Sequence, residues 1–226
     1  MSAHSPCDWL AVAPDPAFES MTLFERQVAR GGSRSIAGVD EAGRGPLAGP
    51  IVAAAVILGE PVPGVDDSKR LTQARREEWY EILMSGPHTV SAEVVDHDTI
   101  DTHGIQTANY MAMARALEGL DPPADFALVD GFTIRGCRTP QLRIVKGDRR
   151  SQSIAAASII AKVTRDRIMR ELDSEFPEYG FARHKGYATR DHLIALETHG
   201  PCRVHRRSFS PIAATVETLQ LFQDTG

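Results

Sequence analysis

The chain has 226 residues, 42% of them hydrophobic, which is enough for the core of one α/β domain with a small appendage. Its longest apolar run, residues 51–58, is too short to cross a bilayer, and no charged start with an apolar core follows Met1. We therefore expect neither a membrane span nor a secretory signal. Three widely spaced cysteines without metal-ligand spacing favour a reducing cytoplasm.

The net charge of −5 is unevenly distributed along the chain. Between Arg143 and Ser210, Lys and Arg outnumber Asp and Glu, whereas the rest of the chain is strongly acidic. A basic region of this kind can follow a phosphate backbone. A solvated charged face is the alternative interpretation.

The first elements in chain order are a loose arm and a short helix. Residues 1–20 mix Pro, Asp, Ala and Ser without periodicity, which is typical of an arm. Thr22 is then placed to cap a helix that ends near Arg30, with Glu25 at the capping-box position.

Three strands and two helices are expected next. The strands cover residues 35–40, 51–58 and 89–95. Because no long helix separates the first two strands, an antiparallel meander is predicted. Helical spacing of apolar residues predicts helices at 72–84 and 105–120.

The remainder of the chain combines short strands with longer helices. Strands are expected at 126–130 and 141–145, and helices at 151–175 and 191–198. Strands in one sheet with helices on both faces give an α/β fold with a helical C-terminal extension.

Acidic residues stand where several of these strands end. Asp40 and Glu41 follow an apolar strand, Asp130 ends another, and Asp148 comes shortly after a third. Carboxylates are rarely buried at the edge of a sheet unless they are paired or bind a cation. If these strand ends meet, their oxygens suit Mg²⁺ or Mn²⁺, and two such ions can hydrolyse a phosphodiester. Unconnected acids in separate turns are the alternative.

A glycine-rich segment, Gly43 to Gly49, follows the first acidic pair. It lacks the Gly-Lys-Ser/Thr ending of a Walker loop, and the two preceding acids would repel a pyrophosphate. Close approach of bare backbone to a sugar-phosphate chain, with Arg44 nearby, is one use for it. A tight turn between two strands is the other.

Several stretches together resemble bacterial ribonuclease HII. The resemblance runs from about Ile36 to Pro211 and is carried by blocks in order and at family-like spacing. These blocks are Val39-Asp-Glu-Ala-Gly-Arg-Gly-Pro-Leu-Ala-Gly-Pro50, Asp67-Ser-Lys69 with Leu71-Thr72, Val129-Asp-Gly131, Lys146-Gly-Asp148, Ile154 to Asp166, His184-Lys-Gly-Tyr187 and His205-Arg-Arg-Ser-Phe209.

The resemblance implies a ribonuclease H-like fold with a mixed five-stranded sheet, flanking helices and a C-terminal helical extension. We expect the chain to divide into an arm with a short helix (1–34), a ribonuclease H-like catalytic domain (35–170) and a helical extension with a tail (171–226). The resemblance also implies an endonuclease that hydrolyses RNA in RNA/DNA hybrids and nicks duplex DNA at single ribonucleotides, leaving 3′-hydroxyl and 5′-phosphate ends.

The resemblance further assigns the site residues. The catalytic carboxylates that hold two Mg²⁺ or Mn²⁺ ions would be Asp40, Glu41, Asp130 and Asp148. The residues that grip the ribonucleotide would be Gly43, Arg44 and Gly45, with Tyr187 against the sugar. The expected phosphate contacts are Ser68, Lys69 and Lys185. Recognition of the 2′-hydroxyl is the physical means of distinguishing RNA from DNA at one nucleotide.

Three other residues that could take part in catalysis are expected to have structural roles instead. Asp166 is expected in a surface ion pair on its helix, and His184 and His205 in hydrogen bonds within turns. We expect a monomer. Gln220-Leu221-Phe222 in the C-terminal tail is a candidate contact for a sliding clamp, with an amphipathic end segment as the alternative.

Two other functions fit the same residues less well. A DNA-specific nuclease on this fold gains nothing from Gly-Arg-Gly and Tyr187, and a binding module without catalysis would not need a complete acidic set. Ribonuclease HIII carries an additional N-terminal substrate-binding domain, for which the residues before the first strand are too few.

Overall fold

A computed structural model of the chain describes residues 20–65, 68–210 and 212–213. At its centre is a mixed five-stranded sheet in the order β3-β2-β1-β4-β5. The strands are β1 (Ile36–Ala42), β2 (Ile51–Ile57), β3 (Thr89–Val95), β4 (Phe126–Asp130) and β5 (Gln141–Ile144). The α/β class expected from the sequence is confirmed.

The first three strands form the expected antiparallel meander. β2 is buried along its whole length, as its uninterrupted apolar sequence predicts for a strand covered on both faces. β4 runs parallel to β1, and β5 runs parallel to β4. β1 is therefore the central strand, and it ends on the same side of the sheet as β4 and β5.

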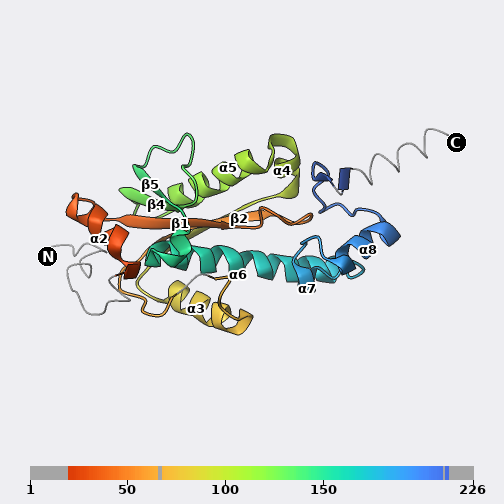
Figure 1. Ribbon diagram of the computed structural model, residues 1–226, viewed down its shortest axis with the longest axis horizontal. Coiled ribbons are helices and arrows are strands. Elements are labelled where there is room, and N and C mark those ends of the chain that lie inside the picture. Colours follow the sequence, from red (N-terminus) through yellow and green to blue (C-terminus); the bar gives the residue numbers. More distant parts are fainter. Residues whose placement is uncertain (1–19, 66–67, 211, 214–226) are drawn as a thin grey trace.

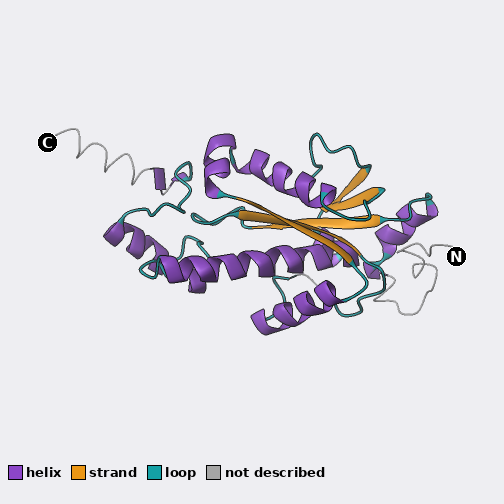
Figure 2. Cartoon of the chain, turned by 180° about the vertical axis from the view of Figure 1, so that it is seen from behind, coloured by secondary structure: helices purple, strands orange, loops and turns teal. Residues whose placement is uncertain are grey.

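Helices cover both faces of the sheet (Figures 1 and 2). The first face packs against α5 (Ile105–Glu118) and the short α4 (His97–His103), which the sequence did not predict. The second face packs against α6 (Gln152–Glu175) and α3 (Gln73–Ser85). Because side chains alternate along a strand, neighbouring residues of β1 point toward different helical layers.

The long helix α6 begins directly against the central strand. Ser151 caps it, since its hydroxyl accepts a hydrogen bond from the amide of Ile154 at 3.2 Å. A Cβ added at Gly38 in β1 would lie only 2.0 Å from the carbonyl carbon of Ser153. Glycine at this position of β1 therefore lets the first turn of α6 approach the backbone of the sheet.

The expected capping box in α2 (Leu23–Arg30) is wrong. Thr22 occupies the N-cap position, but its side chain makes no capping hydrogen bond. Glu25 is buried and points toward the start of α6 instead. Its carboxylate accepts hydrogen bonds from the hydroxyls of Ser151 and Ser153, at 2.5 and 2.8 Å, and from the Ser153 amide at 3.1 Å. The acidic side chain therefore stabilises the N-terminus of a different helix, which a local spacing rule cannot show.

Glu25→Ala should lower the free energy of unfolding by about 2 kcal/mol, because it leaves buried donors of α6 without an acceptor. Urea unfolding followed by circular dichroism would measure this loss. Glu25→Gln keeps one accepting oxygen and should stay within about 1 kcal/mol of the wild type. Glu171→Ala, at an exposed position of α6, is the matched control. An alanine variant as stable as this control would show that the contact is not stabilising.

The C-terminal extension continues from α6 (Figure 1). This helix runs without interruption through residue 170, so the expected domain division falls inside it. After it come α7 (Phe181–His184), which was not predicted, and α8 (Arg190–His199). They enclose a smaller core that includes Leu47, Met169 and Phe181. Through Met169 and Leu47, the extension packs against α6 and against the segment after β1.

The two histidines that were expected to bond within turns do so. His184 Nε2 lies 2.7 Å from the carbonyl oxygen of Tyr179, and His205 Nδ1 accepts from the Cys202 amide at 3.0 Å. His205 Nε2 also lies 3.0 Å from His192 Nε2 inside the extension. Burial is the main cause that lowers the pKa of His205 to about 4.

Some expectations fall on residues outside the described ranges. These are the arm up to residue 19, Asp67 and the candidate clamp contact at residues 220–222. Within the described ranges, no helix combines the length and the hydropathy that a membrane crossing requires.

Candidate metal centre and substrate cleft

Three carboxylates from three elements meet beside the central strand. Asp40 lies inside β1, which continues to Ala42 rather than ending at Asp40 as expected. Asp130 is the last residue of β4, and Asp148 lies in the short η2 (Gly147–Arg149) after β5. One carboxylate oxygen from each of the three lies within 4.8 Å of those of the other two. The parallel order of β1, β4 and β5 thus brings distant acids to one place.

Local geometry fixes these carboxylates. Asp40 accepts a hydrogen bond from the Glu41 amide at 2.7 Å, and Asp130 accepts one from the Gly147 amide at 2.6 Å. A Cβ added at Gly147 would lie 3.3 Å from the same Asp130 oxygen and 2.5 Å from Ile154. Glycine at this position therefore allows η2 to approach β4 and to carry Asp148 toward Asp130.

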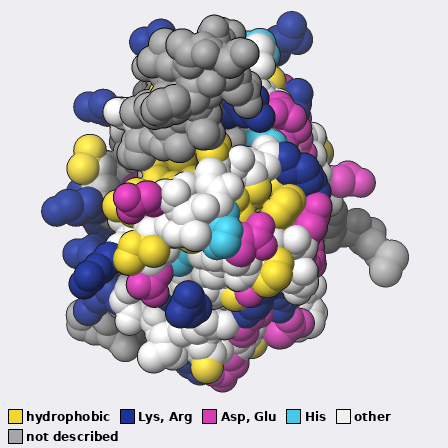
Figure 3. Space-filling model, turned by 90° about the vertical axis from the view of Figure 1, so that its right-hand side faces the viewer, with side chains coloured by type: hydrophobic (Ala, Val, Ile, Leu, Met, Phe, Trp, Pro, Cys, Tyr) yellow, Lys and Arg dark blue, Asp and Glu magenta, His cyan; other side chains and the backbone are white. Residues whose placement is uncertain are grey.

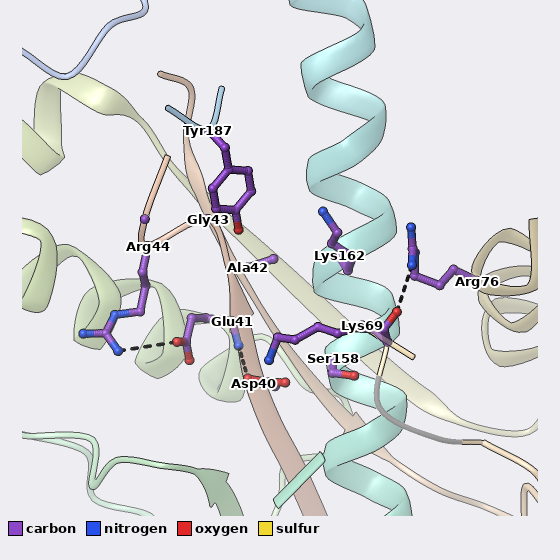
Figure 4. Close-up of a pocket in the computed structure, with 12 residues that line it drawn as sticks. Asp40, Glu41, Ala42, Gly43, Arg44, Lys69, Arg76, Ser158, Lys162 and Tyr187 are labelled. Atoms are coloured by element: carbon purple, nitrogen blue, oxygen red, sulfur yellow. Dashed lines mark hydrogen bonds and ion pairs between the residues drawn. The ribbon is translucent and has the colours of Figure 1, made fainter. Parts of the chain in front are cut away.

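Glu41 lies outside this group of three. It follows Asp40 in the strand and therefore points toward the opposite helical layer. Its carboxylate lies 3.8 Å from the guanidinium of Arg44, and Asn109 of α5 contributes to lowering its pKa. Figure 4 shows Asp40 and Glu41 diverging from the strand, with Glu41 directed toward Arg44.

The cluster concentrates negative charge in a buried place. Burial, followed by repulsion from Glu41 and Asp130, raises the pKa of Asp40 well above its ordinary value. Burial also raises the pKa of Glu41 to about 7, although Arg44 opposes the shift. Lys69 Nζ lies 3.5 Å from Asp148 Oδ2. Closely spaced carboxylate oxygens are hard ligands, so this donor set fits Mg²⁺ or Mn²⁺.

The raised pKa of Glu41 predicts how stability depends on pH. A group whose folded pKa exceeds its unfolded value stabilises the folded state at low pH and loses this effect as pH rises through the folded pKa. In EDTA, the free energy of unfolding should therefore fall between pH 4.5, the ordinary pKa of Glu41, and about 7. Urea unfolding at several pH values would measure this fall.

Glu41→Gln removes one titrating group from the cluster. Its stability should fall less steeply with pH than that of the wild type, while Asp40 keeps part of the dependence. Equal slopes for the two proteins would contradict the assignment of the raised pKa to Glu41.

A cleft of about 430 Å³ opens beside these acids (Figure 4). It contains most of the residues that the sequence singled out. These are Asp40, Glu41, Gly43, Arg44, Gly45, Ser68, Lys69 and Tyr187. In Figure 4, Arg44 lies on one side of the cleft, Lys162 on the other and Tyr187 above Asp40.

Lys185 does not line this cleft. It follows α7 in the left-handed backbone region with φ of 53°, and its ammonium donates to the carbonyl of Ala182. Its own carbonyl accepts from Arg165 at 3.0 Å. In this structure Lys185 shapes the turn that leads to Tyr187.

The side chain of Arg44 is turned toward α5. Its guanidinium donates to Gln106 at 3.0 Å and lies 4.3 Å from the centre of the Phe132 ring. With Glu41 at 3.8 Å, these contacts anchor the side chain at the edge of the cleft. The side chain therefore leaves the amides of Arg44 and Gly45 open to a ligand in the cleft.

Three residues that line the cleft were not identified as site residues from the sequence. They are Arg76, Ser158 and Lys162. Ser158 and Lys162 are four residues apart on α6 and therefore share a face, which spacing alone could have shown. Asp166 was expected at the surface, but it is buried and pairs with Lys162 at 2.7 Å. This ion pair orients a lysine at the border of the cleft.

Comparisons with known proteins point to one family. The family model of ribonuclease HII matches residues 37–212. Ribonuclease HII of Geobacter metallireducens is 50% identical over 202 residues, which covers 88% of this chain and 95% of the relative. The crystal structure of ribonuclease H2 from Pyrococcus horikoshii OT3 superimposes with a TM-score of 0.68 at 26% identity. That match covers 82% of this chain and 99% of the other.

A second solved structure shares the fold, from the complex of PCNA and RNase HII of Archaeoglobus fulgidus. It has a TM-score of 0.66 at 27% identity and covers 77% of this chain and 95% of the other. The ribonuclease H-like fold is thereby confirmed, together with the mixed sheet and the helical extension. With a family match over most of its length, the chain belongs to the ribonuclease HII family, metal-dependent endonucleases that act on RNA in RNA/DNA hybrids.

Proposed function

We propose that this protein also nicks duplex DNA at a single embedded ribonucleotide and leaves 3′-hydroxyl and 5′-phosphate ends. The observation that carries the proposal is the position of the carboxylate cluster beside a cleft lined by Gly43, Gly45 and Tyr187. One side of this site suits divalent cations, and the other offers backbone and an aromatic ring to a sugar.

The carboxylates Asp40, Asp130 and Asp148 would hold two Mg²⁺ or Mn²⁺ ions with substrate bound. Glu41 is the fourth carboxylate of the proposed set, and it would have to turn from Arg44 toward these three to act as a ligand. Bound there, the ions would supply Lewis-acid chemistry for the hydrolysis of a phosphodiester. Lys69 lies beside Asp148 and is 74% exposed, which suits contact with an adjacent phosphate. Ser68, also in the cleft, would bind the same strand.

Recognition of the ribose would come from the opposite side of the cleft. Tyr187 is 46% exposed, and a Cβ added at Gly45 would lie 3.6 Å from its ring. A sugar that enters here would meet the bare backbone of Gly45 and the ring of Tyr187 together. A 2′-hydroxyl can both donate and accept a hydrogen bond, which deoxyribose cannot do at that position.

The rest of the duplex would contact charged surface. Figure 3 shows the end of the molecule near α8, where Lys and Arg side chains are numerous on the left and are mixed with acidic side chains over the rest of the view. The excess of Lys and Arg over Asp and Glu between Arg143 and Ser210 supports an electrostatic contribution to duplex binding. The affinity for the duplex should therefore weaken as salt rises.

The test is cleavage of a DNA duplex that carries one ribonucleotide. In Mg²⁺ the protein should nick on the 5′ side of the ribonucleotide, and EDTA should abolish the product. An otherwise identical all-DNA duplex should remain intact. Cleavage of the all-DNA duplex at a similar rate would remove the proposed ribose recognition while leaving the metal chemistry in place.

We further propose that the protein acts as a monomer and contacts a sliding clamp through residues 220–222. The relative from Archaeoglobus fulgidus was solved in complex with PCNA, which supports a clamp contact. Size-exclusion chromatography with a bacterial clamp should show a complex that is lost when residues 214–226 are deleted. Equal binding of the clamp by the shortened chain would show that the tail is not the contact.

A further inference from the structure

Two arginine side chains are completely buried behind the cleft. Arg165 lies on α6 and Arg206 follows α8, and both are 0% exposed. Among the described residues, no carboxylate lies within ion-pair distance of either guanidinium. Burying a charged group without a counterion is unfavourable unless many hydrogen bonds compensate.

Backbone carbonyls supply these hydrogen bonds, and nearly all of them come from the segment between β1 and β2, which we call the 43–50 loop. Arg206 donates to the carbonyls of five of its residues at 2.6 to 3.2 Å. These residues are Gly43, Arg44, Pro46, Gly49 and Pro50. The loop therefore wraps around one guanidinium.

Arg165 holds the same loop from the other side. Its guanidinium donates to the carbonyls of Pro50 at 2.9 Å and Ala48 at 3.1 Å. A third bond, at 3.0 Å, reaches Lys185, two residues before Tyr187. Arg165 thus joins the loop to the turn that carries the exposed tyrosine.

These contacts determine which way the loop amides point. In a trans peptide the carbonyl and the N–H point in opposite directions. Arg206 binds the carbonyls of Gly43 and Arg44, so the amides of Arg44 and Gly45 point away from it. In the described part of the chain these two amides donate to no protein acceptor, and both residues line the cleft.

The buried charges also favour an anion at these amides. Burial lowers the pKa of Arg206 to about 9 and that of Arg165 to about 10, so both remain charged at neutral pH. A guanidinium bound to the carbonyl of a peptide polarises the N–H of the same peptide. Successive backbone N–H groups of this kind form a site for an electronegative oxygen.

We propose that Arg206 and Arg165 are positioning residues that hold the 43–50 loop with the amides of Arg44 and Gly45 directed at the substrate. The substrate atom is an oxygen of a ribonucleotide, either its 2′-hydroxyl or the adjoining phosphate, and this assignment rests on the proposed function. Neither arginine touches the substrate, because both are enclosed by the protein.

The experiment compares Arg206→Met and Arg206→Lys with the wild type. Met keeps much of the volume without the donors, and Lys keeps the charge without the planar fork. Arg167→Met is the matched control, since Arg167 lies two residues after Arg165 and pairs at the surface with Glu77 and Glu81. Thermal unfolding establishes whether each variant folds.

Three quantities are measured on each folded variant. Amide hydrogen exchange at Leu47 and Gly49, which donate to Gly186 and Val204, reports the loop without any substrate. Calorimetric titration with Mn²⁺ alone reports the carboxylate cluster. The kcat and KM values on the duplex with one ribonucleotide report the consequence for cleavage.

For Arg206→Met we expect exchange at Leu47 and Gly49 to accelerate at least about tenfold and kcat/KM to fall about 100-fold. Arg206→Lys should show about a tenfold fall in kcat/KM. Mn²⁺ affinity should stay within about twofold of the wild type in both. Arg167→Met should match the wild type in all three measurements.

Unchanged loop exchange or unchanged kcat/KM in a folded variant would overturn the proposal, as would a parallel loss of Mn²⁺ affinity. If Arg206→Met does not fold, Arg206→Lys decides by the same criteria. An unfolded Arg206→Lys would overturn the positioning role in favour of general stability. If the wild type does not cleave at the ribonucleotide, the proposed function fails separately, and the exchange comparison still tests the loop.

Discussion

Asp40→Asn should reduce cleavage at least about 1,000-fold and make the metal-free protein more stable than the wild type. The variant removes a negative ligand from the carboxylate cluster, and cations at such a site contribute several kcal/mol to the transition state. The same change relieves the burial and repulsion that raise the pKa of Asp40. Without metal at about pH 8, the gain should be on the order of 1 kcal/mol.

Cleavage in Mg²⁺ and urea unfolding in EDTA measure the two effects of Asp40→Asn. Asn keeps an oxygen that can accept from the Glu41 amide, so the fold should be preserved. Asp98→Asn is the matched control because its side chain is 84% exposed, and it should change neither quantity. An Asp40→Asn protein that keeps a tenth of the activity would show that this carboxylate is not essential.

Gly43→Ala should lose stability, whereas Gly45→Ala should lose activity, although the two glycines are only two residues apart. Gly43 has φ of +104°, and a Cβ there would lie 2.2 Å from Arg165 Nε and 2.8 Å from the Pro50 carbonyl oxygen. A methyl group at this position strains the backbone and displaces a buried arginine. The free energy of unfolding should fall by about 3 kcal/mol.

At Gly45 the protein itself leaves room for a methyl group. The nearest atom to an added Cβ is in the Tyr187 ring at 3.6 Å, an ordinary contact. Gly45→Ala should therefore unfold like the wild type, while kcat/KM on the ribonucleotide duplex falls about 100-fold, because the methyl group would occupy the place proposed for the sugar. Unfolding curves and steady-state kinetics on both variants separate the two cases. Full activity in Gly45→Ala would place the sugar elsewhere.

The sheet was predictable from sequence because its signals are local. The uninterrupted apolar run of β2 and the short connection from β1 led directly to the meander. Asp130 and Asp148 could be singled out because Asp130 ends the apolar strand β4 and Asp148 comes shortly after β5. Their meeting with Asp40 was left open by the strands alone, since it depends on the order of β1, β4 and β5.

Other parts of the site depend on long-range packing, which no spacing rule reveals. Arg165 and Arg206 look like the other cations of a basic region, and only the folded chain shows that they are buried. Glu25 matched a local capping pattern but binds the start of a helix more than a hundred residues later. Asp166 was placed at the surface because helical spacing gives no information about which face of α6 is covered.

The contact between Gly43 and Arg206 spans 163 residues, so it sets an order of events while the chain is being made. Residues up to Glu175 contain the carboxylate cluster, all five strands and the helices that cover both faces of the sheet, so this part can fold before the rest of the chain has left the ribosome. The 43–50 loop is then still without its central guanidinium. Its final shape must wait for the last part of the chain, because such distant contacts form late. A nascent or prematurely ended chain would thus contain the acidic cluster before Arg206 holds the 43–50 loop.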